Sequence, residues 1–134
     1  MDLFVYGTLM VPKIMRAVCG YARPGLPARL WGHRRGRLAG ETYPAIVPSI
    51  GHHVDGLLYR GVSPRQIRQL DRFEGPMYRR TLVRVEVDGV RFRSAVYRLA
   101  PTYYRRLQRG AWSLQGFVAR DRAAFVTTYR GFHG

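Results

Sequence analysis

The sequence has little cysteine, and its N-terminus lacks the features of a targeting segment. Cys19 is the only cysteine among 134 residues, so an intrachain disulfide cannot form and a disulfide-stabilised secreted domain is excluded. The first residues, MDLFVYG, place an acidic residue before a short apolar run. That pattern is typical of neither a secretion signal nor a membrane span. We therefore expect a cytoplasmic protein without a membrane segment.

Acidic residues and lysine are also scarce. The chain carries 23 Lys and Arg residues against 8 Asp and Glu, for a net charge of +15, and Lys13 is the only lysine. Such a surface attracts polyanions and small anionic ligands. However, the arginines are spread from Arg16 to Arg130 and form no single block. A nucleic-acid partner is therefore an alternative that charge alone does not favour.

The composition and the order of elements predict one α+β domain over residues 1–134. With 46% hydrophobic residues, a chain of this length can bury a real core. A strand is expected over Leu3–Tyr6, followed by a helix from Pro12 that ends at Gly20. The next forty residues contain many Gly and Pro breaks, which predict short strands and turns.

The second half of the chain has clearer signals. Ser63-Pro64-Arg65-Gln66 is a capping box that predicts a helix with an apolar stripe at Ile67, Leu70 and Phe73, ended by Gly75-Pro76. Asp88-Gly89 separates two alternating runs, so a hairpin is expected over Tyr78–Val87 and Val90–Leu99. A final helix is expected around Val118–Tyr129. The order predicts a small mixed β-barrel or strongly curved sheet with short flanking helices.

Glu74 is the best candidate for an acid or base. It occupies the last position of the expected helix, where the partial negative charge of the helix end opposes a carboxylate. Aromatic neighbours such as Phe73 and Tyr78 would exclude water, and both effects raise the pKa of a carboxyl group. A raised pKa is what a general base needs near neutral pH. An exposed glutamate at a frayed helix end is the competing interpretation.

Other types of site have weaker support. Four aspartates occupy a terminus, turns or a polar helix face, Glu86 alternates outward on its strand, and Glu41 is in a loop. The histidines lack partners at metal-ligand spacing, so no metal or cofactor is expected. Tyr6-Gly7-Thr8-Leu9 ends the first strand and leaves backbone N–H groups that could bind an anion.

Together, four segments resemble the gamma-glutamylcyclotransferase-like family, and above all its short bacterial and gamma-glutamylamine cyclotransferase branches. They are LFVYGTL from Leu3, YPAIVPS from Tyr43, VDGLLYRGV from Val54 and LDRFEGPMYRRTLVRV from Leu70. The resemblance covers residues 3–99. Beyond it, Gly110-Ala111-Trp112 departs from the Gly-Asp-Trp of many members.

The resemblance implies a small mixed barrel with a metal-independent active site. By position, Tyr6, Gly7, Thr8 and Leu9 match the loop that cradles the substrate, and Glu74 matches the catalytic glutamate. Tyr78 and Arg80 match the Tyr-x-Arg that follows it and are expected to contact substrate.

The implied reaction converts a gamma-glutamyl amide into 5-oxoproline and a free amine, with a small-molecule substrate and Glu74 as general acid and base. The alternative hypothesis is an inactive family member that binds nucleic acid or another polyanion through its basic surface. The sequence leaves the leaving amine and the oligomeric state open.

Overall fold

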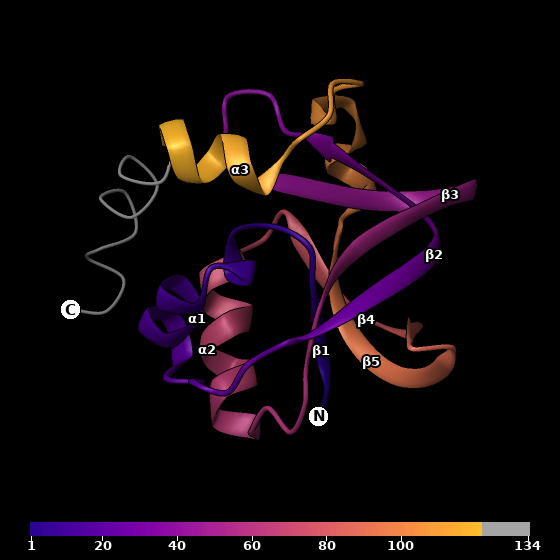
Figure 1. Ribbon diagram of the computed structural model, residues 1–134. Coiled ribbons are helices and arrows are strands. Elements are labelled where there is room, and N and C mark those ends of the chain that lie inside the picture. Colours follow the sequence, from indigo (N-terminus) through magenta and orange to yellow (C-terminus); the bar gives the residue numbers. More distant parts are fainter. Residues whose placement is uncertain (122–134) are drawn as a thin grey trace.

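The computed structural model describes residues 1–121, and these residues form a closed barrel of five strands (Figure 1). The strands are β1 (Leu3–Val5), β2 (Leu26–Arg37), β3 (Pro44–Tyr59), β4 (Tyr78–Val87) and β5 (Val90–Leu99). Their order around the barrel is β1-β3-β2-β4-β5. β1 pairs antiparallel with β3 and parallel with β5. The predicted α+β fold with a small mixed barrel is confirmed.

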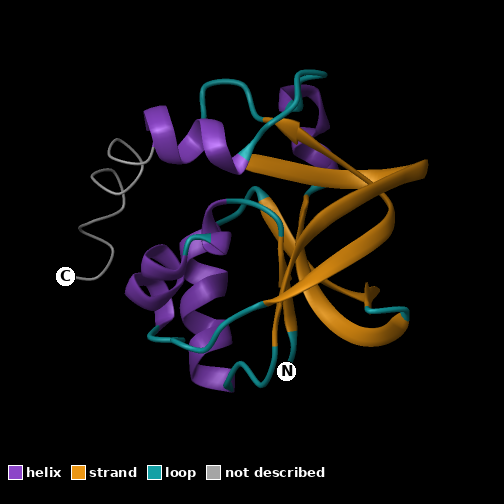
Figure 2. Ribbon diagram, viewed as in Figure 1, coloured by secondary structure: helices purple, strands orange, loops and turns teal. Residues whose placement is uncertain are grey.

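Two helices, α1 (Pro12–Cys19) and α2 (Pro64–Glu74), pack against each other on one side of the barrel (Figure 2). Shorter helical segments follow: η1 (Thr8–Met10), η2 (Pro101–Arg106), α3 (Leu114–Gly116) and η3 (Phe117–Asp121). None of the helices in residues 1–121 has the length and apolar character needed to cross a membrane. The helix expected around Val118–Tyr129 lies mostly outside the described residues.

The ends of α1 and α2 follow the sequence signals. Gly20 ends α1 in the left-handed conformation with φ of 79°, which glycine adopts without steric cost. At the start of α2, the Ser63 side chain accepts a hydrogen bond from the Gln66 N–H, and the Gln66 side chain accepts one from the Ser63 N–H. This capping box satisfies two N–H groups that the helix leaves free.

The segment predicted as short strands and turns instead forms two long strands, so that prediction is wrong. β2 has 12 residues and β3 has 16, and they pair antiparallel with a register shift between Trp31 and His33. Gly32 has φ of 75° and Gly51 has φ of 83°. These glycines therefore mark an irregularity within a continuous hairpin, where a bulge strengthens the local twist.

The hairpin of β4 and β5 has the predicted bounds. Tyr78 pairs with Leu99 at one end and Val87 with Val90 at the other. The turn residues Asp88 and Gly89 both have positive φ, 49° and 79°, as a two-residue hairpin turn of this handedness requires.

Two clusters of buried side chains hold the fold together. One fills the barrel interior and includes Phe4, Ile46, Leu58, Val85 and Val96. The other lies between the barrel wall and the helices, and it contains the apolar stripe of α2: Ile67, Leu70 and Phe73. Because β1 contributes Phe4 to the first cluster and its two neighbours, Leu3 and Val5, to the second, both faces of this short strand are buried.

Gly56 allows β1 and β3 to approach closely. A Cβ atom on Gly56 would lie 2.1 Å from the carbonyl oxygen of Val5 and 2.8 Å from the ring of Phe4. We predict that Gly56→Ala lowers the free energy of unfolding by more than about 2 kcal/mol, because backbone must shift to admit the methyl group. Urea denaturation measures the change. Gly110→Ala is the control, since its nearest atom would lie 4.0 Å away, and equal effects of the two substitutions would contradict the prediction.

Candidate active site

A pocket lies where the end of β1, the end of α2 and the barrel wall meet. It contains about 470 Å³ of empty space, including its open mouth. The lining residues come from β1 and the loop after it, from the start of β3, from the end of α2 and from the hairpin: Phe4, Val5, Tyr6, Gly7, Thr8, Leu9, Tyr43, Pro44, Phe73, Glu74, Tyr78 and Tyr97. Glu74 is the only residue among them with an acidic or basic side chain.

The loop after β1 forms one wall of this pocket. Gly7 is packed against the start of β3, since a Cβ atom on it would lie 2.8 Å from two carbons of the Pro44 ring. Thr8 and Leu9 begin the 3₁₀ helix η1, and the first N–H groups of a helix have no acceptor within it. Because Thr8 and Leu9 line the pocket, their N–H groups are candidate hydrogen-bond donors to a bound molecule. Glycine at position 7 is needed for the close packing against Pro44.

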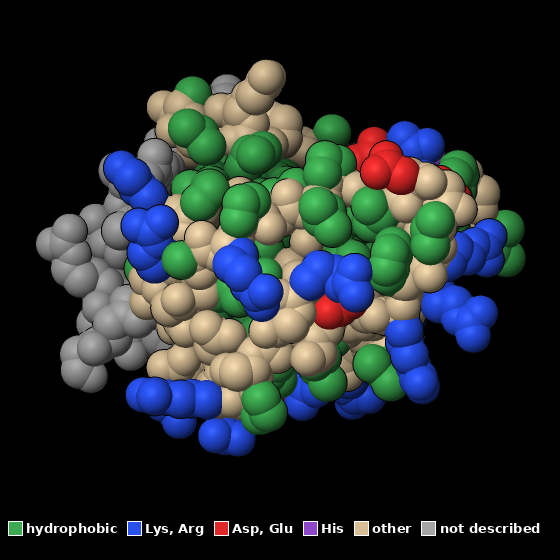
Figure 3. All heavy atoms as spheres, turned by 60° about the horizontal axis from the view of Figure 1, so that its bottom comes forward, with side chains coloured by type: hydrophobic (Ala, Val, Ile, Leu, Met, Phe, Trp, Pro, Cys, Tyr) green, Lys and Arg blue, Asp and Glu red, His purple; other side chains and the backbone are tan. Residues whose placement is uncertain are grey.

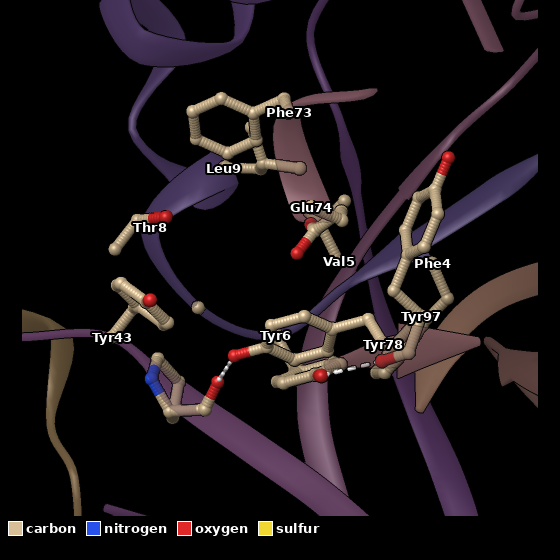
Figure 4. Close-up of a pocket in the computed structure, with 12 residues that line it drawn as sticks. Phe4, Val5, Tyr6, Thr8, Leu9, Tyr43, Phe73, Glu74, Tyr78 and Tyr97 are labelled. Carbon is tan, nitrogen blue, oxygen red and sulfur yellow. Dashed lines mark hydrogen bonds between the residues drawn. The ribbon is translucent and has the colours of Figure 1, made fainter. Parts of the chain in front are cut away.

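Glu74 faces this loop from the end of α2. In Figure 4 its carboxyl group points toward the space bounded by Thr8, Leu9 and Tyr43. Burial raises the pKa of Glu74 to about 8, and the negative charge of Asp71 adds to the shift. The predicted rise in this pKa is thus supported, with burial as its main cause. Near neutral pH the group can either accept or donate a proton.

Tyrosine hydroxyl groups tie the pocket walls together. Tyr6 donates a hydrogen bond to the carbonyl oxygen of Tyr97 on β5 at 2.5 Å, and Tyr78 donates one to the carbonyl oxygen of Pro44 at 2.8 Å (Figure 4). Burial, together with the nearby Glu74, raises the pKa of Tyr6 well above its ordinary value. Tyr6 therefore stays neutral and acts as a donor that links β1 to β5.

Asp71, three residues before Glu74 on α2, is bound to the hairpin. Tyr97 donates a hydrogen bond to the Asp71 carboxylate at 2.6 Å, and Arg80 pairs with the same carboxylate through Nε at 3.0 Å. Burial and this hydrogen bond raise the pKa of Tyr97. Arg80 therefore neutralises a carboxylate next to Glu74, which limits how far Asp71 can raise the pKa of Glu74.

The structure brings together most of the residues singled out in the sequence. Tyr6, Gly7, Thr8, Leu9, Glu74 and Tyr78 all line the pocket. Arg80 does not: its side chain lies outside the lining, on Asp71. Both Nε and Nη2 of Arg80 are held by the Asp71 carboxylate, and the expected contact of Arg80 with substrate stays a prediction.

Sequence reasoning missed Asp71, Tyr97 and Tyr43. Asp71 is three residues before Glu74, a spacing that places both on one helix face, so this signal was available. Tyr97 stands opposite Arg80 in the hairpin, and opposed residues in a sheet share a face. Tyr43 begins the segment YPAIVPS, which belongs to the resemblance, but the segment alone does not place Tyr43 on the pocket wall.

Arg35 supports the loop after β1 from outside the pocket. Its guanidinium group donates to the carbonyl oxygen of Tyr6 at 2.7 Å and to that of Asp55 at 3.3 Å. The group lies over the ring of Trp112, 5.6 Å from the centroid, and burial lowers the pKa of Arg35. Trp112 is itself held by a hydrogen bond to the carbonyl oxygen of Thr42 at 2.9 Å. Trp112 thus contacts both Arg35, which supports the loop after β1, and Thr42, which precedes the pocket residue Tyr43.

The remaining sequence candidates lie elsewhere. Glu41 pairs with Arg106 at 3.3 Å, and Cys19 is buried in the core next to α2. Within residues 1–121, no group of three or more His, Cys, Asp or Glu side chains is arranged to hold a metal ion. The pocket residues themselves offer one carboxyl group with a pKa near 8, backbone donors and aromatic walls. This set suits proton transfer on a small polar substrate.

The raised pKa of Glu74 predicts a pH dependence of stability. Between the ordinary pKa of 4.5 and the folded-state value of about 8, the folded protein holds a proton that the unfolded chain has released, so Glu74 makes the protein less stable as pH rises. Glu74→Gln removes this loss. We expect the free energy of unfolding of Glu74→Gln, relative to wild type, to increase by about 1–3 kcal/mol between pH 5 and pH 8. One pKa unit is worth about 1.4 kcal/mol, and the part of Glu74 that stays in contact with solvent reduces the full effect.

Urea denaturation at several pH values measures this difference. Asp88→Asn makes the same carboxyl-to-amide change at an exposed turn and should show no such gain. If the free energies of unfolding of Glu74→Gln and wild type change with pH in the same way from pH 5 to pH 8, the raised pKa of Glu74 is contradicted.

Comparison with known proteins agrees with the fold. The model of the family described as gamma-glutamyl cyclotransferase, AIG2-like, matches residues 3–114. AIG2-like protein C of Arabidopsis thaliana is 29% identical over 137 residues, which cover 98% of this chain and 77% of that relative. The solution structure of an Arabidopsis thaliana protein has a TM-score of 0.70 at 28% identity, covering 98% of this chain and 80% of that one.

A solved gamma-glutamyl cyclotransferase shares the fold, with a TM-score of 0.66 at 20% identity over 76% of this chain and 72% of that one. The family match spans most of the described residues, including both the loop after β1 and Glu74. The protein therefore belongs to the AIG2-like gamma-glutamyl cyclotransferase family.

Proposed function

We propose that the protein is a cyclotransferase that converts a gamma-glutamyl amide or amine into 5-oxoproline and the free amine. The observation that carries the proposal is the position of Glu74: a carboxyl group with a pKa of about 8, in the lining of a pocket that also contains the loop residues Thr8 and Leu9. The family membership supports this class of reaction, and the chemistry of the pocket residues suits it.

The substrate would be held mainly by backbone groups. A gamma-glutamyl group carries an α-carboxylate, but no Arg or Lys side chain is among the lining residues. The N–H groups of Thr8 and Leu9, which have no acceptor within their helix, would take this carboxylate or the carbonyl oxygen of the amide. A donor aimed at the oxygen that becomes negative in the transition state is worth about 10²–10³-fold in rate.

Glu74 would carry the proton through the reaction. The carboxylate removes a proton from the α-ammonium group of the substrate, and the freed nitrogen attacks the γ-carbonyl carbon to form the ring C–N bond. The protonated Glu74 then donates to the departing nitrogen as the original amide C–N bond breaks. The ring nitrogen still carries two hydrogens after the attack, and one of them passes to the departing amine, which leaves as an ammonium ion while 5-oxoproline keeps one N–H. Water is not consumed, and general acid–base catalysis of this kind is worth about 10²–10⁴-fold.

The aromatic walls would supply the folded geometry that ring closure needs. Intramolecular reactions with well-oriented groups gain about 7–11 kcal/mol over their bimolecular counterparts. Tyr6 and Tyr78 are fixed by hydrogen bonds to strand carbonyl groups, so their rings form rigid surfaces. A gamma-glutamyl chain pressed between these walls and the loop would have its amine held close to its own carbonyl carbon.

The proposal predicts that Glu74→Gln lowers kcat/KM by at least about 100-fold, because the amide keeps the shape of the side chain but cannot accept the proton. Release of 5-oxoproline from a panel of gamma-glutamyl amino acids, gamma-glutamyl-lysine and glutathione measures the activity. Asp88→Asn is the matched control and should retain wild-type rates. Equal rates for Glu74→Gln and wild type on every substrate would remove Glu74 from the mechanism, and a wild type inactive on the whole panel would sink the proposal.

The rate should also depend on pH through Glu74. Only the carboxylate form can accept a proton, so kcat/KM is expected to rise as pH increases from about 6 to about 8, following the raised pKa of Glu74. Steady-state assays in buffers of constant ionic strength measure the profile. A rate that is already constant above pH 5.5 would show that a carboxyl group of ordinary pKa, or none, takes the proton.

A further inference from the structure

The outer face of the β4–β5 hairpin carries a group of exposed arginines. Arg84, Arg91 and Arg93 are exposed and, with Leu82 and Val83, line a shallow groove. Arg84 stands directly opposite Arg93 in the sheet, and opposed residues point to the same face. We call Arg84, Arg91 and Arg93 the hairpin arginines. None of them lines the pocket of Glu74.

The few carboxylates of the protein are mostly engaged elsewhere. The arginine–carboxylate ion pairs in residues 1–121 are Arg29–Asp55, Arg60–Asp2, Arg80–Asp71 and Arg106–Glu41. None of these pairs includes a hairpin arginine. The hairpin has two carboxylates of its own: Glu86, which stands opposite Arg91, and Asp88 in the turn. Neither forms an ion pair with a hairpin arginine in residues 1–121. The hairpin therefore holds a cluster of positive charge that the described residues leave largely uncompensated.

This arrangement costs stability in the isolated protein. Two like charges directly opposed on neighbouring strands repel each other and destabilise the sheet, whereas a pair of opposite charges at the same positions would stabilise it. On the face of the molecule in Figure 3, Lys and Arg side chains appear along much of the outline, while Asp and Glu occupy only small areas. An anionic partner that lies across Arg84 and Arg93 would convert the repulsion into attraction for both.

We propose that the hairpin arginines bind a single-stranded nucleic acid through its phosphates. The guanidinium group offers a planar fork of donors that matches a phosphate in a bidentate way. Arg91 and Arg93 are two residues apart on one strand, about 6.8 Å along it, which is on the scale of neighbouring phosphates in an extended strand. Leu82, two residues from Arg84 on the same strand, is 55% exposed and offers an apolar contact to a base.

The same surface is less suited to a membrane. A membrane-binding surface combines positive charge with a wide apolar face that enters the lipid. Leu82 and Val90 are the exposed large apolar side chains of this hairpin, and they are separated by several residues on opposite strands. An acidic protein would be attracted by charge, but its carboxylates do not repeat at a fixed spacing as phosphates do.

Binding of a fluorescently labelled 20-nucleotide single-stranded RNA, measured by anisotropy between 50 and 300 mM NaCl, tests the proposal. The variant Arg84→Gln/Arg91→Gln/Arg93→Gln is compared with a control that removes the same charge from exposed positions of α2: Arg65→Gln/Arg68→Gln/Arg72→Gln. We expect the hairpin variant to bind at least tenfold more weakly at 100 mM salt, and the slope of log affinity against log salt to fall by about 2, since each phosphate contact on a single strand contributes about 0.7. The control should change affinity less than threefold.

Several outcomes would overturn the proposal. Equal losses of RNA affinity in the two triple variants would mean that binding depends only on net charge. If wild type does not bind the RNA at 50 mM NaCl, the proposed site does not exist. Polyglutamate or anionic lipid vesicles that bind wild type as tightly as the RNA, at equal charge concentration, would assign the face to another partner. Urea denaturation checks that the variants are folded, and the single variant Arg93→Gln, expected to bind about threefold more weakly, gives a second measurement if the triple variant is not. Because 5-oxoproline release is assayed separately, failure here leaves the proposed function untouched.

Discussion

The pairing of β1 with two strands at once is the constraint on which the rest of the structure depends. β1 joins β3 on one edge and β5 on the other, so three residues close the barrel. The loop that follows therefore begins at a fixed point, where Tyr6 is tied to β5 and its carbonyl group to Arg35. The close approach at Gly56 belongs to the same constraint, since any side chain there would push β1 away from β3.

Glu74 is placed beside the loop after β1 by the packing of α2. The apolar stripe of α2 sets the rotation of the helix against the barrel, and the helix ends at the carboxyl group that faces the loop. Placing this carboxyl group in a poorly solvated pocket costs folding energy, because burial disfavours its charged form. The site thus weakens the fold locally, and the large apolar clusters on both sides of the barrel wall offset that cost.

Charge is organised separately from this site. Within residues 1–121, four carboxylates form ion pairs with arginines, for example Asp71 with Arg80 beside the pocket and Glu41 with Arg106. Because the chain has eight acidic residues for 23 basic ones, acidic residues are too few to pair with every arginine. The arginines are spread evenly along the sequence. In the folded protein they are not spread evenly, because the pairing of β4 with β5 places Arg84 next to Arg93. The net charge follows from the composition alone, whereas the grouping of the hairpin arginines follows from the register in which β4 pairs with β5.

The sequence by itself determined the features that depend on neighbouring residues. The capping box of α2, the Asp88-Gly89 turn and the position of Glu74 at a helix end are all local, because backbone conformation there is set within a few residues. Only the tertiary structure decided that Gly32 and Gly51 interrupt one long hairpin without ending its strands, that Tyr43 and Tyr97 line the pocket, and that Arg80 turns to Asp71. These outcomes depend on contacts between residues far apart in the chain, whose free energies exceed local preferences and leave no local pattern.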